Sequence, residues 1–273
     1  MPTLTLPDGT GIVYDEVGTG SPALVMVHGY TGGRWYYEKD LEAFSSSRRC
    51  IALDLAGHGD SDKPTDRVYS VEQFARDIDD FTRILGLDRF VLFGHSMGGM
   101  IAQTYALDNN SHARCVGLVL ISTAASMMLR DELSAAMNRE LSLYEKGEWK
   151  PNLEVQRAIA RSVWEPDYAN THSDEVDRAF NESQRIPDII RIKLLLSMAE
   201  EFDLSERIAD INLPTLVCVG SEDMLRKGAE IIADTIPNAR FRLFDKVGHM
   251  INIEIPEPIQ KEIASFLNEE FPR

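Results

Sequence analysis

Short apolar runs alternate with helix-like segments along the first half of the chain, and this alternation restricts the fold more than any other feature. Four runs have the character of buried strands, at residues 23–29, 49–57, 89–95 and 115–123. The segments between them have helical spacing; residues 70–87, for example, repeat apolar side chains every three or four positions. Near-continuous apolar strands separated by helices predict an α/β fold with a mostly parallel sheet covered by helices on both faces.

Two further features complete the predicted topology. The turn "PDGTG" near the N-terminus joins two strand-like stretches into a hairpin. Between residues 127 and 199 the strand pattern stops and only helix-like segments occur; two more strands and two helices follow, beginning with "LPTLVCVGSED". We therefore expect an eight-stranded core made of residues 1–126 and 200–273, into which residues 127–199 are inserted as a helical unit.

The composition restricts the partners and the compartment. With 44 acidic and 28 basic residues, the 273-residue chain has a net charge of −16, which disfavours binding to nucleic acid or to anionic membranes. The cysteines Cys50, Cys115 and Cys218 lie far apart in apolar runs, a pattern that indicates neither disulfides nor a metal site. We find no leader-like N-terminus and no apolar run of membrane-spanning length, and therefore expect a cytoplasmic protein.

The stretch "VLFGHSMGGMIAQ" places Ser96 between a predicted strand and a predicted helix, with Gly94 and Gly98 two residues away on either side. A G-x-S-x-G pattern in this context is typical of a nucleophile elbow. The sharp turn pushes the serine towards positive φ and leaves room only for glycine beside it. Its hydroxyl is then exposed at a helix start, where N–H groups favour developing negative charge. The pattern therefore predicts Ser96 as a nucleophile.

A nucleophilic serine needs a base and an acid that orients the base, and in elbow enzymes the chain order is Ser, Asp or Glu, then His. Three histidines follow the serine. His112 and His172 lie in polar, loop-like stretches, whereas His249 comes just after the last predicted strand, and we predict His249 as the base. Glu222 and Asp223 both end the seventh predicted strand; we predict Asp223 as the acid and keep Glu222 as the alternative.

Five sequence blocks, in the right order, resemble those of the α/β-hydrolase superfamily. They are the oxyanion loop "HGYTGG", the loop "DLAGHGDSDKP", the elbow "GHSMGG", the acid strand "PTLVCVGSED" and the histidine loop "GHMINIEIPEPI". The resemblance implies Ser96 as nucleophile, Asp223 as acid and His249 as base. It also implies an oxyanion hole formed by the backbone N–H groups of Tyr30 and Met97, and a role for residues 127–199 as a cap over the active site.

Other polar residues in these blocks have expected structural roles. Asp54 and Ser61 are expected to satisfy the backbone of a tight loop shaped by glycines, and His28 is expected to brace the oxyanion loop through hydrogen bonds. Arg226 departs from the family pattern, because many relatives have a proline three residues after the acid. This departure concerns the shape of the acid loop and not the choice of Asp223.

A serine nucleophile narrows the chemistry that this fold implies. Haloalkane dehalogenases and epoxide hydrolases attack with an aspartate, and a cysteine would have indicated dienelactone hydrolysis. The sequence has no phosphate loop, dinucleotide motif or metal-ligand cluster, so we expect no cofactor and no metal. Cleavage of esters, thioesters, amides, lactones and carbon–carbon bonds remains open, as do cofactor-free perhydrolysis (haloperoxidase-type chemistry) and a non-enzymatic role as a small-molecule receptor.

Among these alternatives we predict a serine esterase for small neutral carboxylic esters, with lactones such as an acyl homoserine lactone or an enol-lactone as further substrates. The cap is rich in apolar residues, and only Arg34 stands beside the oxyanion loop, which disfavours polyanionic substrates. The residues expected to line the substrate pocket are Trp35, Tyr36, Met128, Trp149, Trp164 and Met250.

Overall fold

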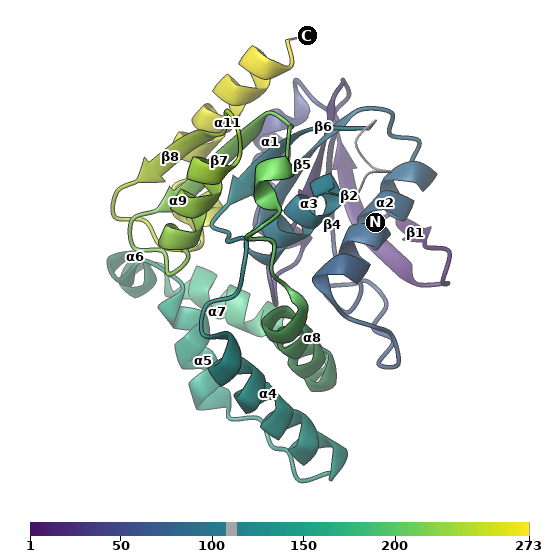
Figure 1. The fold of residues 1–273 in the computed structure, drawn as a ribbon, viewed down its shortest axis with the longest axis vertical. Helices are drawn as coiled ribbons and strands as arrows, with labels where there is room; N and C mark the ends of the chain where they lie inside the picture. The colour runs from purple at the N-terminus through teal and green to yellow at the C-terminus, as the bar shows by residue number, and fades with distance from the viewer. Residues whose placement is uncertain (108–113, 273) are drawn as a thin grey trace.

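A computed structural model describes residues 1–107 and 114–272, and its centre is an eight-stranded sheet in the order β1-β2-β4-β3-β5-β6-β7-β8 (Figure 1). Strands β1 and β2 pair antiparallel, as do β2 and β4, and the other neighbours are parallel. The mostly parallel α/β fold predicted from the sequence is confirmed. The strands are β1 (Thr3–Thr5), β2 (Gly11–Val17), β3 (Ala23–Val27), β4 (Cys50–Leu53), β5 (Phe90–His95), β6 (Cys115–Ile121), β7 (Thr215–Gly220) and β8 (Arg240–Phe244).

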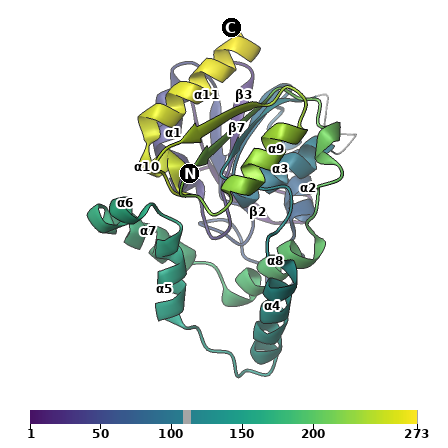
Figure 2. The ribbon, with the colours of Figure 1, turned by 60° about the vertical axis from the view of Figure 1, so that its left-hand side comes forward.

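Helices cover both faces of this sheet (Figure 2). One face carries α1 (Glu38–Ser45), α10 (Ile251–Glu254) and α11 (Pro256–Glu270), together with the short 3-10 helix η1 (Arg34–Tyr37). The other face carries α2 (Val71–Ile84), α3 (Met97–Leu107) and α9 (Arg226–Thr235), with the 3-10 helix η2 (Ile208–Asp210). Within the described ranges, no helix combines the length and the apolar character needed to cross a membrane.

The central strands are apolar throughout because both of their faces are buried. In β3, Val25 and Val27 join the hydrophobic cluster under α2 and α3, whereas Leu24 and Met26 join the cluster under α1 and α11. Side chains of a strand point alternately to its two faces, so a strand between two helical layers must be apolar at every position. This is the physical reason for the uninterrupted apolar runs in the sequence.

The pairing register brings the ends of the strands to one edge of the sheet. Val27 lies opposite Gly94. His95 lies opposite Ile121, which in turn lies opposite Cys218. Because these strands are parallel, the segments that follow β3, β5, β6, β7 and β8 all start at the same, carboxyl-terminal edge. The three residues predicted for catalysis follow β5, β7 and β8, so the fold brings them to this edge.

The inserted helical segment, which we call the cap, lies beyond that edge and falls between β6 and β7 in the sequence (Figures 1 and 2). Helix α4 packs along α8, and α5 packs along α7. At the base of the cap, a β-bridge joins Ser126 to Asp203, and the N–H of Leu204 donates to the carbonyl of Ala125 at 2.7 Å. The cap helices are α4 (Arg130–Glu145), α5 (Leu153–Ser162), α6 (Pro166–Thr171), α7 (Ser173–Ser183) and α8 (Asp188–Glu201).

Asp40 is a buried carboxyl group that ties α1 to the C-terminal helices. Its two oxygens accept hydrogen bonds from Asn252 Nδ2 at 2.7 Å and from Gln260 Nε2 at 3.2 Å. Burial raises the pKa of Asp40 to about 7, because the two hydrogen bonds only partly offset the loss of hydration. The folded protein therefore keeps this proton at pH values where the unfolded chain has lost it.

We expect Asp40→Asn to remove one contribution to the pH dependence of folding stability, the one that makes stability fall as pH rises. Between the ordinary aspartate pKa and about 7, the folded state binds one proton more than the unfolded state, so stability falls as pH rises through this range. One such proton contributes a slope of at most about 1.4 kcal/mol per pH unit. Urea unfolding at pH 5, 6 and 7 should show that the stability of the variant relative to the wild type increases as pH rises. Glu42→Gln, at an exposed position of the same helix, should keep the wild-type slope, and an unchanged slope in Asp40→Asn would contradict the prediction.

Candidate active site

Ser96 stands in the sharp turn between β5 and α3. Its φ angle is +54°, in the left-handed region that costs a residue with a Cβ about 1–3 kcal/mol. The backbone holds this turn, because the Ser96 N–H donates to the carbonyl of Ile121 at 2.9 Å and the Ser96 carbonyl accepts the Thr123 hydroxyl at 2.7 Å. Every other residue from 90 to 103 is buried, whereas Ser96 is partly exposed. The turn therefore presents its hydroxyl at the surface of the core.

The glycines beside Ser96 are required by close backbone contacts. A Cβ on Gly98 would lie 1.9 Å from the carbonyl oxygen of Val27, at the end of β3. A Cβ on Gly94 would lie 2.2 Å from the carbonyl oxygen of Gly98. Any side chain at these positions would push the start of α3 away from β3 and β5. The crowding that the sequence pattern predicts is thus present in the fold.

His249 and Asp223 form a hydrogen-bonded pair at the same edge of the sheet. His249 Nδ1 lies 2.9 Å from Asp223 Oδ1. An ionised carboxylate can only accept, so Nδ1 carries the proton of this hydrogen bond, and Nε2 is the acceptor in the neutral tautomer that this bond selects. Burial alone would raise the pKa of Asp223, but the charge and hydrogen bond of His249, with the N–H of Leu225, lower it to about 2. The acid is therefore ionised at neutral pH.

The alternative acid, Glu222, lies elsewhere. Its side chain is exposed, and within the described residues its carboxylate accepts only the hydroxyl of Ser221, at 3.2 Å. The neighbouring Arg226, which departs from the family pattern, begins α9; its N–H donates to the carbonyl of Asp223 at 3.1 Å, and its side chain pairs with Glu230. The acid loop is thus closed by its backbone without a proline, and Asp223 is the carboxylate that meets His249.

Two buried histidines brace the loops around the site. His28 accepts the N–H of Leu55 at Nε2, 3.0 Å away, so its Nδ1–H donates to the carbonyl of Gly29 at 2.8 Å. His95 Nε2 lies 2.9 Å from the carbonyl oxygen of His249 and must donate to it. Burial lowers the pKa of His95 to about 3, so this ring is neutral. The bracing role expected for His28 is confirmed.

The predicted oxyanion donors lie beside the elbow. A Cβ on Gly29 would lie 3.0 Å from the Ser96 Cβ, so the loop that carries Tyr30 touches the turn that carries Met97. The N–H groups of Tyr30 and Met97 make no hydrogen bond within the part of the chain that the structure describes. The Tyr30 hydroxyl points to the cap, where it donates to the carbonyl of Arg191 in α8 at 3.2 Å. Both N–H groups are therefore free of protein acceptors in the described residues, as the oxyanion-hole prediction requires.

The loop after β4 has the structural role expected for it. Asp54 accepts the N–H groups of Arg34 at 2.7 Å and Asp60 at 2.9 Å. The Ser61 hydroxyl donates to the Asp54 carbonyl at 2.7 Å and accepts the N–H of Val13 at 2.8 Å. These side chains therefore satisfy the backbone around a tight loop, and neither is aimed at a reacting group.

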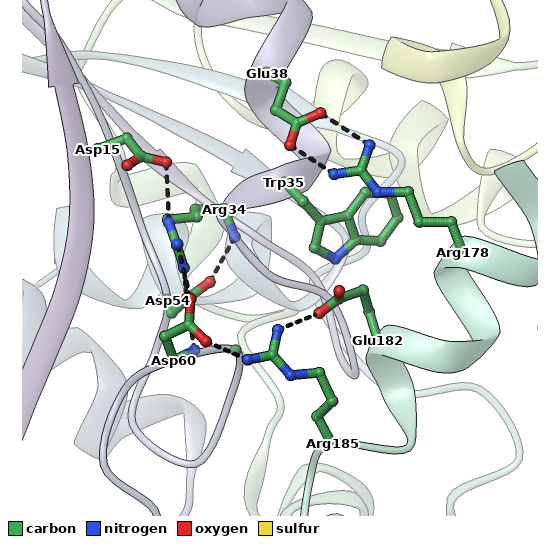
Figure 3. Close-up of a pocket in the computed structure, with 10 residues that line it drawn as sticks. Asp15, Arg34, Trp35, Glu38, Asp54, Asp60, Arg178, Glu182 and Arg185 are labelled. Atoms are coloured by element: carbon green, nitrogen blue, oxygen red, sulfur yellow. Dashed lines mark hydrogen bonds and ion pairs between the residues drawn. The ribbon is translucent and has the colours of Figure 1, made fainter. Parts of the chain in front are cut away.

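A charged cavity of about 150 Å³ lies between the core and cap helix α7, with none of the three candidate catalytic residues in its lining (Figure 3). Arg178 binds Glu38 through two hydrogen bonds of 2.9 and 2.6 Å, and Arg185 pairs with Asp60 and Glu182. Arg34 in turn pairs with three carboxylates, those of Asp15, Asp54 and Asp60. Every arginine around this cavity is therefore neutralised by carboxylates.

The residues predicted to line a pocket are spread over several places. Tyr36 is buried, with its ring stacked on His95 at 4.3 Å between centroids, and Trp35 lies in the wall of the charged cavity. Trp164 and Met250 are buried beside the histidine loop.

The other two pocket residues lie near opposite ends of α4. Met128 is 55% exposed just before this helix. Beyond its end, Trp149 donates its indole N–H to Glu140 at 2.6 Å. The structure thus brings only Trp164 and Met250 next to His249.

Two other histidines follow Ser96 in the sequence. His172 is exposed on the cap, with its ring stacked on Tyr168 at 3.9 Å between centroids. His112 lies outside the described residues. Over residues 1–107 and 114–272, no group of three or more His, Cys, Asp or Glu side chains is arranged to hold a metal ion, and the three cysteines are buried with free thiols.

Sequence reasoning missed Ser122, a buried residue that follows β6 with a φ of +51°. Its hydroxyl helps to lower the pKa of Asp223, after the larger effects of burial and of His249. Ser122 Oγ and Asp223 Oδ2 nevertheless lack a hydrogen bond of normal geometry in the described part of the chain. Ser122 follows β6, and β6 pairs with β7, the strand that precedes Asp223. The sequence order alone does not reveal this pairing, so it gave no signal for the contact.

Comparison with known proteins agrees with this architecture. A family model described as "alpha/beta hydrolase fold" matches residues 22–256. A proline iminopeptidase of Lactobacillus delbrueckii subsp. lactis is 27% identical, with 96% of each chain covered. A thermophilic esterase from Thermogutta terrifontis superposes with a TM-score of 0.87 at 25% identity over 99% of both chains. Est816, an N-acyl homoserine lactone degrading enzyme, superposes with a TM-score of 0.81 over 97% of this chain and 100% of its own; at 23% identity this likeness shows the fold alone.

Proposed function

The chain belongs to the α/β-hydrolase fold family, and on that premise we propose that it is a serine hydrolase of small neutral carboxylic esters, with lactones as further substrates. Ser96 attacks the carbonyl carbon while His249 takes its proton, and Asp223 orients and stabilises the histidine. The N–H groups of Tyr30 and Met97 bind the oxyanion. Water then cleaves the acyl-enzyme with the same base.

One observation carries this proposal: the 2.9 Å hydrogen bond between His249 Nδ1 and Asp223 Oδ1, at the edge where Ser96 is held at positive φ. The pair fixes the histidine tautomer that can accept the serine proton. The strained turn and the two unpaired N–H groups add the nucleophile and the oxyanion donors. Together these are the parts that acyl transfer requires.

The preference for neutral substrates follows from the charges near the site. Arg34, the arginine next to the oxyanion loop, is bound to Asp15, Asp54 and Asp60. The positive charge of Arg34 is therefore already neutralised and cannot attract an anionic substrate. The net charge of −16 also disfavours the approach of an anion. Small neutral esters and lactones meet no such penalty.

A second candidate substrate class is the amide, because one relative of 27% identity over nearly the full length is named proline iminopeptidase. Carbon–carbon hydrolysis and cofactor-free perhydrolysis use the same fold and are distinguished by substrate alone. A receptor of this fold would bind a small molecule without multiple turnovers. Amide and carbon–carbon substrates are therefore measured beside the esters, and the absence of multiple turnovers on all of them would favour a receptor.

We expect kcat/KM to be higher for p-nitrophenyl acetate, butyrate and octanoate than for palmitate. A pocket closed by a cap has a finite size, so a long acyl chain must leave it or displace the cap. A γ-lactone, an acyl homoserine lactone, proline p-nitroanilide and a carbon–carbon substrate complete the measurement. Fastest turnover on palmitate, or activity confined to the anilide or to the carbon–carbon substrate, would contradict the ester proposal.

A further inference from the structure

The loop that carries His249 is held by the cap as well as by the core. The N–H of His249 donates to the carbonyl of Val163, between α5 and α6, at 2.8 Å. The N–H of Gly248 donates to Glu254 Oε2 at 2.7 Å, and the carbonyl of His249 accepts from His95. The backbone at residues 248–249 is therefore held by one contact with the cap and two with the core.

Glu254 connects these two parts directly. While Oε2 binds Gly248, Oε1 accepts the N–H of Glu165, in the cap, at 3.3 Å. The segments are in close contact, since a Cβ on Gly248 would lie 2.4 Å from the Glu165 nitrogen and 2.7 Å from the Trp164 carbonyl carbon. One carboxylate thus bridges the residue before His249 and Glu165, the N-cap residue of α6.

The charge of Glu254 is balanced by backbone groups only. Burial raises the pKa of this carboxyl, while the N–H groups of Gly248, Glu165 and Met250 act in the opposite direction. No lysine, arginine or histidine forms an ion pair with Glu254 in residues 1–107 and 114–272. Burying a carboxylate without a cation costs free energy unless hydrogen bonds replace the lost hydration. Here these hydrogen bonds come from backbone N–H groups on both sides of the cap–core contact.

We propose that Glu254 is a positioning residue that fastens cap residues 163–165 to the histidine loop, so that His249 is placed for catalysis only while this part of the cap is seated. The inference rests on the proposed function, because it assigns His249 the role of base. Movement of residues 163–165 changes the position of His249 through Val163 and Glu254, and this links closure of the cap to the chemical step.

Two substitutions break this link in different ways. Glu254→Gln keeps the size of the side chain but replaces an acceptor oxygen with an N–H₂ group that faces a backbone N–H. Gly248→Ala changes no charge and forces residues 164–165 away from the loop. Glu257→Gln is the matched control, because Glu257 is exposed three residues further along and its side chain makes no hydrogen bond within the described ranges.

We expect both variants to lose about 100-fold in kcat on p-nitrophenyl butyrate with little change in KM, since a shift of about 1 Å in a reacting group has an effect of this size. Hydrogen exchange should become faster in peptides that contain residues 163–170 and 247–250, and remain unchanged in β3 and β5. The low-field NMR signal of the His249 Nδ1 proton should broaden or shift. Glu257→Gln should match the wild type in all three measurements.

The exchange and NMR measurements need no substrate, so they test the link even if the wild type hydrolyses none of the esters. If the wild type hydrolyses none of the esters, the proposed function is wrong. Faster exchange and an altered His249 signal in the two variants would still support the link between the cap and the histidine loop. Wild-type rates and exchange in Glu254→Gln would overturn it. Loss of the cooperative unfolding transition in both variants would also overturn it, because Glu254 would then serve overall stability and not the placement of His249.

Discussion

Replacing Ser96 with alanine is expected to lower kcat/KM for p-nitrophenyl butyrate by about 10⁴-fold or more while the protein stays folded. The hydroxyl is the only group of Ser96 that the proposed mechanism uses; the turn is held by the Ser96 backbone, which donates to Ile121 and accepts from Thr123. Alanine keeps the Cβ and therefore the same backbone conformation at a φ of +54°. Steady-state kinetics and thermal unfolding of both proteins check the prediction.

Ser46→Ala is a suitable control for the serine variant. Ser46 is exposed at the end of α1, on the face of the sheet away from the elbow helix, and its removal should change neither rate nor stability. If Ser96→Ala retained a tenth of the wild-type rate, Ser96 would not be the nucleophile. If Ser96→Ala lost both its activity and its unfolding transition, the loss of activity would be explained by a disrupted turn and not by the missing Ser96 hydroxyl.

Asp223→Asn is expected to cost about 10³- to 10⁴-fold in kcat. The neutral amide can present its N–H₂ group to His249, which stabilises the tautomer with the proton on the wrong nitrogen, and it removes the charge that stabilises the protonated ring. The low pKa of Asp223 means that the carboxylate is charged over the whole working range of pH, so the loss should not be recovered at alkaline pH. Rates from pH 6 to 9 check this.

The neighbouring carboxylate supplies the matched control. Glu222→Gln makes the same chemical change one residue away, on an exposed side chain that accepts from Ser221, and should leave the rate close to that of the wild type. If Glu222→Gln were the more damaging substitution, the hydrogen bond between His249 and Asp223 would not be the one that catalysis uses.

Much of the architecture was accessible from the sequence because it depends on local patterns. The apolar run at β3 is uninterrupted because both of its faces are buried, and the positions around Ser96 require glycine because a Cβ there would lie about 2 Å from neighbouring backbone atoms. In the cap, apolar residues recur at helical spacing, and this pattern also predicts helices there. Short elements were missed: α6 and α10 have too few residues to show a period, and both depend on contacts with the rest of the fold.

Pocket residues were harder to predict because side-chain direction depends on how the cap packs. Trp149 is a large apolar residue, yet its indole N–H binds Glu140 beside the end of α4, and Met128 is mostly exposed. Tyr36 instead packs in the core against His95. Nor does the sequence indicate that Glu254 bridges two distant segments, because its partners Gly248 and Glu165 are backbone N–H groups, which any residue except proline supplies.

The β-bridge between Ser126 and Asp203 means that the chain leaves the core and returns to it at the same place. An insertion whose ends already touch can be lengthened, shortened or exchanged without re-routing any strand of the sheet. Recombination at this point would exchange the inserted segment and leave the sheet and its loops in place, as long as the incoming segment reproduces the contact with the histidine loop. The same junction offers a site for grafting cap segments between related enzymes in the laboratory.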